Sequence, residues 1–369
     1  MIREEINEIK KQFNKDTNVI TKYAGCYVDA EKNIKFMTKD AFYSLPEEDA
    51  FKYEEIFRKT LSGAVGKSLL TLDFSIDEEG EDTPHAFLMK LRESRLDDEL
   101  ILDEFFRKVI GAYEYAENYY IILVDMMYDI PGKSSDKLAM EDASNEVYHG
   151  LLCSICPVTL SKPALSYFAN EGVIANRIRD WIVGMPMHGF LFPAFTDRTT
   201  DIHAALYFSK KNDALNESFI NEIIGVNPPM SSVMQKETFE AVLYDVLRDE
   251  LTMPVMSALS SNMLDLIAEN SQNPEPLVLT KNDMVKLISK SGVSDEAVES
   301  YEKSADADIE VLADNVVDTK KFEVKTPGIT VKTDTDSIEK LETRVIDGRK
   351  YLLVPIEDDV EVNGMPVKA

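Results

Sequence analysis

Cysteine is scarce in this sequence, and the features of exported and membrane proteins are missing. The chain of 369 residues has three cysteines, Cys26, Cys153 and Cys156, which are too few for the disulfide network of a secreted protein. Its amino terminus is charged from the third residue and has no apolar core of a secretory signal. The apolar run YYIILV, at residues 119–124, is far too short to cross a bilayer. We therefore expect a reduced, cytoplasmic protein without a membrane partner.

Positive charge is also in short supply. The chain has 40 Lys and Arg residues against 67 Asp and Glu residues, which gives a net charge of -27. Binding to nucleic-acid backbones requires Lys and Arg to displace counterions, so the composition disfavours a general nucleic-acid binder. A local basic patch, a basic partner and mimicry of nucleic acid stay open. The simplest interpretation is an acidic surface that keeps the protein in solution.

Complete nucleotide-binding and hydrolase motifs are absent from the sequence. Gly66-Lys67-Ser68 resembles the end of a phosphate-binding loop, but the first glycine of that motif would fall at Leu61. The preceding segment has helical spacing, whereas the motif needs a strand that leads into the loop. Neither Gly-x-Ser-x-Gly nor His-Glu-x-x-His occurs. No cofactor-binding residues are predicted, and the cofactor is unknown.

The apolar content of 44% is enough to bury a large core. Residues 118–131 are β-rich and almost continuously apolar, as in a central strand covered on both faces. Residues 189–210 favour a neighbouring strand pair or a strand with a kinked loop, in which Pro193 favours an edge or bulge. Residues 40–63 and 85–117 have helical spacing. The predicted fold class is α/β (α+β): a central mixed sheet with flanking helices, then a small helical segment and a C-terminal all-β module.

Changes in composition divide the chain into four predicted parts. The main α/β domain is expected at residues 1–269, and a polar linker with two prolines at residues 270–277. A helical segment at residues 278–321 begins with Thr280 as its N-cap. A small β module at residues 322–369 completes the chain.

The β module is predicted from alternating side chains and from turn dipeptides. Asp347-Gly348 suits a tight hairpin turn, because glycine adopts positive φ freely and aspartate tolerates it. Val345, Tyr351 and Leu353 are expected to form a buried face. We expect a compact module, separable from the main domain and marginally stable alone, since few residues bury little apolar area.

A polar segment between two apolar runs is the first candidate catalytic site. If residues 197–203 were extended, Asp197, Asp201 and His203 would share one face of a strand. Two carboxylates and an imidazole bind divalent metals or act as acid and base, and Arg198 would stabilise a phosphate. The alternative, which we favour, is a structural turn, since Asp and Thr side chains bond nearby backbone amides.

The cysteines provide a weaker candidate for a metal site. Cys153 and Cys156 form a Cys-x-x-Cys pair, which Cys26 and His149 would complete as a three-Cys, one-His site. The alternative is that Cys153 and Cys156 are reduced, buried hydrophobes.

Arginine beside the only tryptophan provides a weak candidate for ligand binding. Arg177 and Arg179 precede Trp181, and such a pattern recognises anions or stacks on bases. The alternative is a surface strand or helix that Trp181 anchors.

Several stretches together resemble a known family over nearly the whole chain. They include AGCYVD, KTLSGAVGKSLL, LLCSICPVTLSKPALSY, DWIV, GFLFPAFTDRTTDIHAALYFSK, PPMSSVMQKETF, VVDTKKFEV and RVIDGRKYLLVP with VEVNG. The sequence resembles an uncharacterised family of Firmicutes proteins, domain of unknown function 4317. The resemblance implies a bacterial cytosolic protein and assigns no catalytic residue.

The favoured function is a non-enzymatic, intracellular binding or regulatory protein with a protein partner. It rests on the missing motifs, and catalysis stays open because enzymes also assemble sites from scattered residues. One alternative is a metal-assisted hydrolase of a phosphate ester or nucleic acid. Another is a factor associated with the ribosome or nucleoid. A homo-oligomer is possible, and the sequence does not identify the partner.

Overall fold

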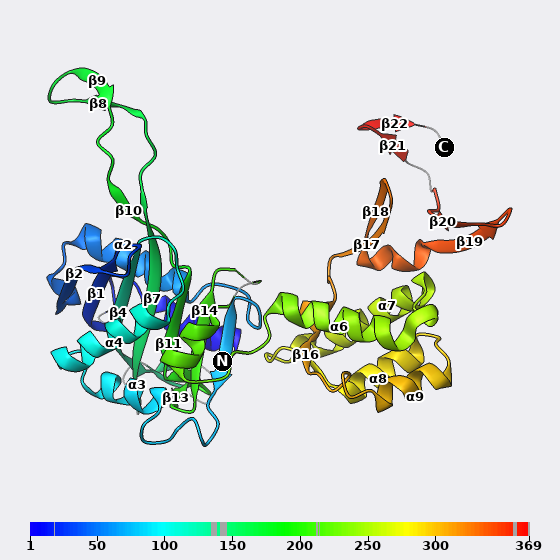
Figure 1. The fold of residues 1–369 in the computed structure, drawn as a ribbon, viewed down its shortest axis with the longest axis horizontal. Helices are drawn as coiled ribbons and strands as arrows, with labels where there is room; N and C mark the ends of the chain where they lie inside the picture. Colours follow the sequence, from blue (N-terminus) through cyan, green and yellow to red (C-terminus); the bar gives the residue numbers. More distant parts are fainter. Residues whose placement is uncertain are drawn as a thin grey trace. The chain divides into compact units, whose positions relative to one another are not determined.

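An antiparallel sheet forms the centre of residues 1–231 (Figure 1). The computed structural model describes residues 1–17, 19–133, 139–140, 146–211, 213, 215–356 and 360–367. The chain divides into two compact units, Met1–Ser231 and Ser232–Ala369. The predicted domain limits at residues 269, 277 and 321 stay predictions.

The main sheet has eight strands, and seven of them follow the order β2-β1-β4-β7-β11-β14-β3. The eighth strand, β10, pairs with the end of β7. The predicted α+β fold class is confirmed. The sheet is antiparallel rather than mixed, because all the named strand pairings within it are antiparallel. The strands of this sheet are β1 (Ile20–Val28), β2 (Ile34–Ala41), β3 (Leu69–Asp73), β4 (Tyr119–Ile130), β7 (Glu146–Leu160), β10 (Trp181–Val183), β11 (His188–Phe192) and β14 (Ala204–Ser209).

Small hairpins interrupt the connections between these strands. Each pairs two short neighbouring strands and is separate from the main sheet. They are β5 (Gly132–Lys133) with β6 (Ala139–Met140), β8 (Leu165–Phe168) with β9 (Val173–Asn176), and β12 (Ala194–Thr196) with β13 (Thr199–Asp201).

Strand β4 is the central strand that the apolar run predicted. Ile121 and Leu123 belong to the core cluster on one face of the sheet, and Ile122 and Val124 to the cluster on the other. This alternation follows from the two-residue period of a strand. Both faces of β4 are therefore buried, as predicted.

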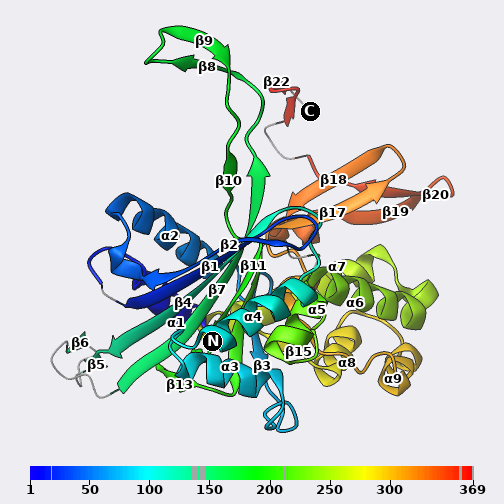
Figure 2. The same ribbon diagram turned by 60° about the vertical axis from the view of Figure 1, so that its left-hand side comes forward.

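Helices cover both faces of the sheet (Figure 2). Residues of α3 (Pro84–Glu93), α4 (Glu99–Ala112), α5 (Glu217–Phe219) and the π-helix η2 (Ile220–Ile224) pack in one core cluster. The other cluster contains residues of α1 (Arg3–Lys11), the 3-10 helix η1 (Phe42–Ser44) and α2 (Glu47–Thr60). Thr83 and Asp98 accept backbone N–H groups at the starts of α3 and α4, which fixes where these helices begin.

The second unit begins with helices around a core of its own. Thr280 is the N-cap of α8 and forms a capping box with Asp283, which confirms the predicted helix start. The helices are α6 (Ser232–Leu247), η3 (Arg248–Glu250), α7 (Met253–Glu269), η4 (Asn270–Gln272), α8 (Lys281–Lys290), α9 (Asp295–Lys303) and α10 (Ala313–Val316), with β15 (Val278–Leu279) paired to β16 (Val311–Leu312).

The C-terminal part has the predicted turns but not the predicted buried face. Asp347 and Gly348 have φ of 48° and 75°, as a type I′ turn requires. Val345 and Tyr351, however, are 66% and 42% exposed. The expected buried face is wrong for these two residues, and each hairpin is a two-stranded sheet that pairs with no other described strand. The hairpins are β17 (Lys321–Thr326) with β18 (Ile329–Asp334), β19 (Glu342–Ile346) with β20 (Arg349–Leu353), and β21 (Val360–Val362) with β22 (Met365–Val367), and η5 (Thr335–Lys340) follows the first.

Within the part of the chain that the structure describes, no helix combines the length and apolar character needed to span a membrane.

Candidate functional site

Residues 189–210 contain the strand pair that the sequence predicted. β11 and β14 pair in the main sheet, and the β12–β13 hairpin lies between them. Pro193 lies between β11 and β12 and belongs to neither strand. Asp197 and Arg198, with φ of 52° and 59°, occupy the two turn positions of the β12–β13 hairpin. The segment therefore contains the turn that its composition favours, and the catalytic role of these residues stays a prediction.

The side chain of Arg198 is directed at helix α1. Its Nη2 donates to Oε1 of Glu8 at 2.8 Å, and its Nε donates to Oε2 of Glu8 at 3.0 Å. Nη2 also donates to the Pro131 carbonyl at 3.1 Å, and the Tyr128 hydroxyl donates to Glu8 at 3.0 Å. The hydrogen bonds that Arg198 donates to Glu8 raise the pKa of its guanidinium. This pair ties the turn to α1.

The other three candidate residues have different partners. Nδ1 of His203 lies 2.6 Å from Oε1 of Glu79, and Oδ1 of Asp201 accepts the backbone N–H of His203 at 3.1 Å. The backbone N–H of Asp197 donates to Glu5 at 2.6 Å. Among the described residues, no three His, Cys, Asp or Glu side chains gather into a possible metal site. The four candidates do not form one constellation, and the hydrolase hypothesis stays a prediction.

The contact between His203 and Glu79 makes a testable pH prediction. Glu79 raises the pKa of His203 above 6.5, the ordinary value. The pair therefore stabilises the fold below pH 6.5, and its contribution disappears as the pH rises through the raised pKa of His203. We expect Glu79→Gln to move this pKa back toward 6.5, as measured by NMR titration of the four histidines. Glu81→Gln in the same loop is the control, and an unchanged His203 titration in Glu79→Gln would contradict the prediction.

The three cysteines are distributed over both faces of the sheet. Cys26 and Cys153 belong to the core cluster that contains α3 and α4, whereas Cys156 belongs to the opposite cluster. All three are free thiols with no exposed surface, and burial raises the pKa of Cys26 to about 12. The predicted burial of Cys153 and Cys156 as free thiols is confirmed. The fold does not gather them around His149.

His149 instead forms a buried polar cluster that the sequence analysis missed. Its Nε2 lies 2.6 Å from Oδ1 of Asp125, a fully buried carboxylate on β4. The hydroxyl of Thr21 donates to the other carboxylate oxygen, and Nε of Arg92 donates to the His149 carbonyl at 2.7 Å. The sequence contains one indication of this cluster, because Asp125 is the only charged residue among residues 119–128, which are otherwise apolar or aromatic.

The Asp125–His149 pair has part of the geometry of an acid–base site. A carboxylate that accepts from imidazole fixes the ring and its tautomer. In the described part of the chain, however, no Ser, Thr or Cys side chain is hydrogen-bonded to this imidazole, since the Thr21 hydroxyl faces Asp125. We assign the cluster to the core.

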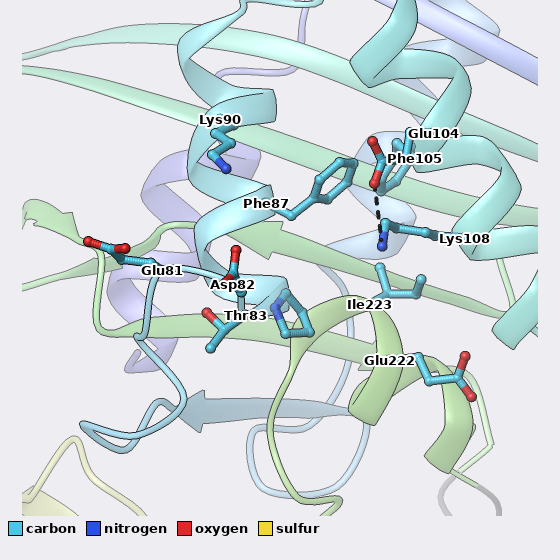
Figure 3. Close-up of a pocket in the computed structure, with 11 residues that line it drawn as sticks. Glu81, Asp82, Thr83, Phe87, Lys90, Glu104, Phe105, Lys108, Glu222 and Ile223 are labelled. Atoms are coloured by element: carbon cyan, nitrogen blue, oxygen red, sulfur yellow. Dashed lines mark ion pairs between the residues drawn. The ribbon is translucent and has the colours of Figure 1, made fainter.

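A small pocket opens beside the first turn of α3 (Figure 3). Its volume is about 240 Å³, and α3, α4 and η2 contribute to its walls. Lys108 pairs with Glu104 at 3.5 Å, and its Nζ lies 5.2 Å from the centre of the Phe87 ring. Figure 3 shows Lys90 and Glu222 on opposite sides of the pocket. Because the lining carries charges of both signs, the pocket favours no single class of charged ligand.

Residues 161–187, which we call the arm, leave the sheet between β7 and β11 (Figures 1 and 2). β8 and β9 pair at its tip, and β10 pairs with β7 at its base. Between these pairs, the Arg177 N–H donates to the Ala164 carbonyl at 2.8 Å and the Ser161 N–H to the Asp180 carbonyl at 2.9 Å. The arm is therefore a hydrogen-bonded, two-stranded ribbon.

The arm presents large apolar side chains to solvent. Leu165, Ile174 and Ile178 are 75%, 69% and 72% exposed. More than half of the exposed large apolar side chains described in residues 1–231 lie in the arm: Leu165, Tyr167, Val173, Ile174, Ile178, Trp181, Ile182, Val183 and Met185. The candidate ligand-binding residues Arg177, Arg179 and Trp181 are all part of this ribbon.

The arm corrects one prediction about the sheet. Several segments within residues 148–210, the arm included, are rich in β-formers, a composition that predicts adjacent strands of one sheet. β8 and β9 instead form a sheet of two strands. β propensity indicates that a segment is extended but does not identify its neighbour. The polar tip, Asn170-Glu171-Gly172, was a readable turn signal, with Gly172 at φ 66°.

Sequence comparison extends over both units of the chain. No curated protein matches it. A family model described as domain of unknown function (DUF4317) matches residues 1–365, which include the whole sheet, the arm and nearly all of the C-terminal hairpins. The chain therefore belongs to the DUF4317 family.

Proposed function

We propose that this protein is a non-enzymatic binding or regulatory protein that holds a protein partner through its arm. The exposed apolar ribbon carries the proposal. A two-stranded ribbon is marginally stable by itself. Burying its exposed apolar surface against a partner would stabilise the complex by about 25 cal/mol per Å². Contiguous exposed apolar surface on a folded protein marks an interaction site.

The charges of the arm indicate the chemistry of the partner. Lys162, Arg177 and Arg179 outnumber Glu171 and Asp180 by one, although the whole chain has a net charge of -27. A complementary surface is therefore apolar with an acidic rim. The exposed side chains of the arm are mainly apolar, which favours the apolar surface of a protein partner over the phosphate backbone of a nucleic acid.

Affinity capture with the tagged full chain tests the proposal. The arm variant Ile174→Ser/Ile178→Ser/Trp181→Ser removes three apolar contacts, and truncation of an interface anchor typically costs 2 kcal/mol or more. We therefore expect at least a tenfold loss of captured partner, since tenfold corresponds to about 1.4 kcal/mol. All three residues are exposed, so the fold should stay intact, as circular dichroism would show.

The matched control replaces exposed apolar residues outside the arm. Ile76 and Leu100 are 92% and 82% exposed, and Ile76→Ser/Leu100→Ser should leave capture unchanged. A folded arm variant that retains every partner of the parent chain would overturn the proposed function.

A further inference from the structure

Residues 1–231 have a second exposed apolar surface, which is concave. A groove of about 780 Å³, which we call the α2 groove, is lined by η1 and the first turns of α2. Phe42 is buried at its floor, in an edge contact with the Tyr43 ring at 5.7 Å. Tyr43 and Phe51 are 50% and 47% exposed, and Leu45 is partly buried. The aromatic side chains of Tyr43 and Phe51 in the groove are therefore about half exposed to solvent.

Acidic side chains predominate around the α2 groove. Glu54 is almost fully buried and lies 3.6 Å from Arg58, whereas Asp16, Glu47 and Glu48 are exposed. Among the exposed charged residues of the lining, Asp16, Glu47 and Glu48 outnumber Lys15 and Lys52 by one, since Glu54 is buried and paired with Arg58. The groove thus has the surface that the arm requires: apolar, with an acidic rim.

We propose that the arm of one copy docks in the α2 groove of a second copy of this chain. This inference rests on the proposed function of the arm and names its partner. The arm is projecting, apolar and net positive, and the groove is concave, apolar and net negative. A second copy covers both surfaces at once, and reciprocal docking closes a symmetric dimer, the commonest form of oligomer.

The length of the arm is compatible with docking on another molecule. Beyond the pairing of β10 with β7, each side of the ribbon has about ten residues, which at about 3.3 Å per residue gives a reach of about 33 Å. Both views show the ribbon directed away from the sheet (Figures 1 and 2). Its tip is therefore accessible to a second copy.

Sedimentation velocity of the purified full chain, from low to high micromolar concentration, is the first test. We expect a concentration-dependent mass above that of one chain. Ile174→Ser/Ile178→Ser in the arm and Phe51→Ser in the groove should each weaken association at least tenfold. The exposed control Ile76→Ser/Leu100→Ser should associate like the parent chain. A chain that stays monomeric at all concentrations would overturn the inference.

Charge reversal tests whether arm and groove meet. Arg177→Glu in the arm and Glu47→Lys/Glu48→Lys in the groove should each weaken association about tenfold, the effect of a close interfacial ion pair worth about 1.5 kcal/mol. Mixing or combining the two reversals should restore association toward the parent value. Two weakened variants that fail to restore each other would contradict docking in this groove.

Photocrosslinking identifies the contact directly. With p-benzoylphenylalanine in place of Ile174, a mixture of isotope-labelled and unlabelled full chains should give crosslinks between position 174 of one copy and residues 42–54 of the other. Crosslinks confined to one copy, or directed to the C-terminal hairpins, would overturn the inference. If the chain is monomeric while the arm variant still loses another protein in affinity capture, self-docking fails and the proposed function stands. If the arm variant loses neither, both fail.

Discussion

Replacing Asp125 with alanine should lower the free energy of unfolding of residues 1–231 by about 2–3 kcal/mol, because removing a buried hydrogen-bond acceptor leaves its donors unsatisfied. Asp125 has no exposed surface and is bonded to His149 and Thr21. In Asp125→Ala the imidazole and the hydroxyl lose this acceptor inside the core. Hydrogen exchange of the β4 amides in increasing urea, read by mass spectrometry, measures the loss in the unit concerned.

Asp129→Ala is the matched control for this measurement. Asp129 lies on the same strand and is exposed, so its replacement should change the free energy of unfolding by at most about 0.5 kcal/mol. A loss below about 1 kcal/mol in Asp125→Ala would show that the buried cluster contributes little to stability.

Gly189→Ala should destabilise the same unit by about 3 kcal/mol, near the upper end of the usual cost of overpacking. A Cβ at this position would lie 2.3 Å from the Cys153 carbonyl oxygen and 2.6 Å from Cγ2 of Thr60. The carbonyl belongs to the paired strand β7, so it moves only if the pairing of β7 with β11 is distorted. The same hydrogen-exchange measurement in urea reports the change.

The control is a glycine in open surroundings. A Cβ on Gly111 would meet no atom within 4 Å, and the residue lies in helix α4. Gly111→Ala should therefore stabilise by about 0.5–1 kcal/mol, since alanine loses less conformational entropy in a helix. Equal effects at the two glycines would contradict the packing argument.

The sequence predicts best those features that depend on near neighbours. The apolar residues of β4 alternate between two core clusters, and an Asp-Gly dipeptide forms the turn of the β19–β20 hairpin. The Asp197–Arg198 turn follows from local composition in the same way. Such features require only a strand period or a φ preference.

Features that depend on distant partners were not predictable. Arg198 is bonded to Glu8, 190 residues away, and no local pattern identifies that partner. The same is true of Asp125 with His149. For the arm and for the hairpin around Val345, alternation predicts two faces but cannot say whether another layer covers either. The predicted buried face of the C-terminal module was wrong for this reason.

The strand order has a consequence for the growing chain on the ribosome. β3 lies at one edge of the main sheet, beside β14, so its neighbour is synthesised only when Ala204–Ser209 emerges. At about 5–20 residues per second, roughly ten seconds separate the two strands. During that interval Leu69 and Leu72, buried in the finished fold, have no sheet to join. The nascent polypeptide thus exposes these apolar residues until translation has passed the arm, and we expect it to bind chaperones that act during synthesis.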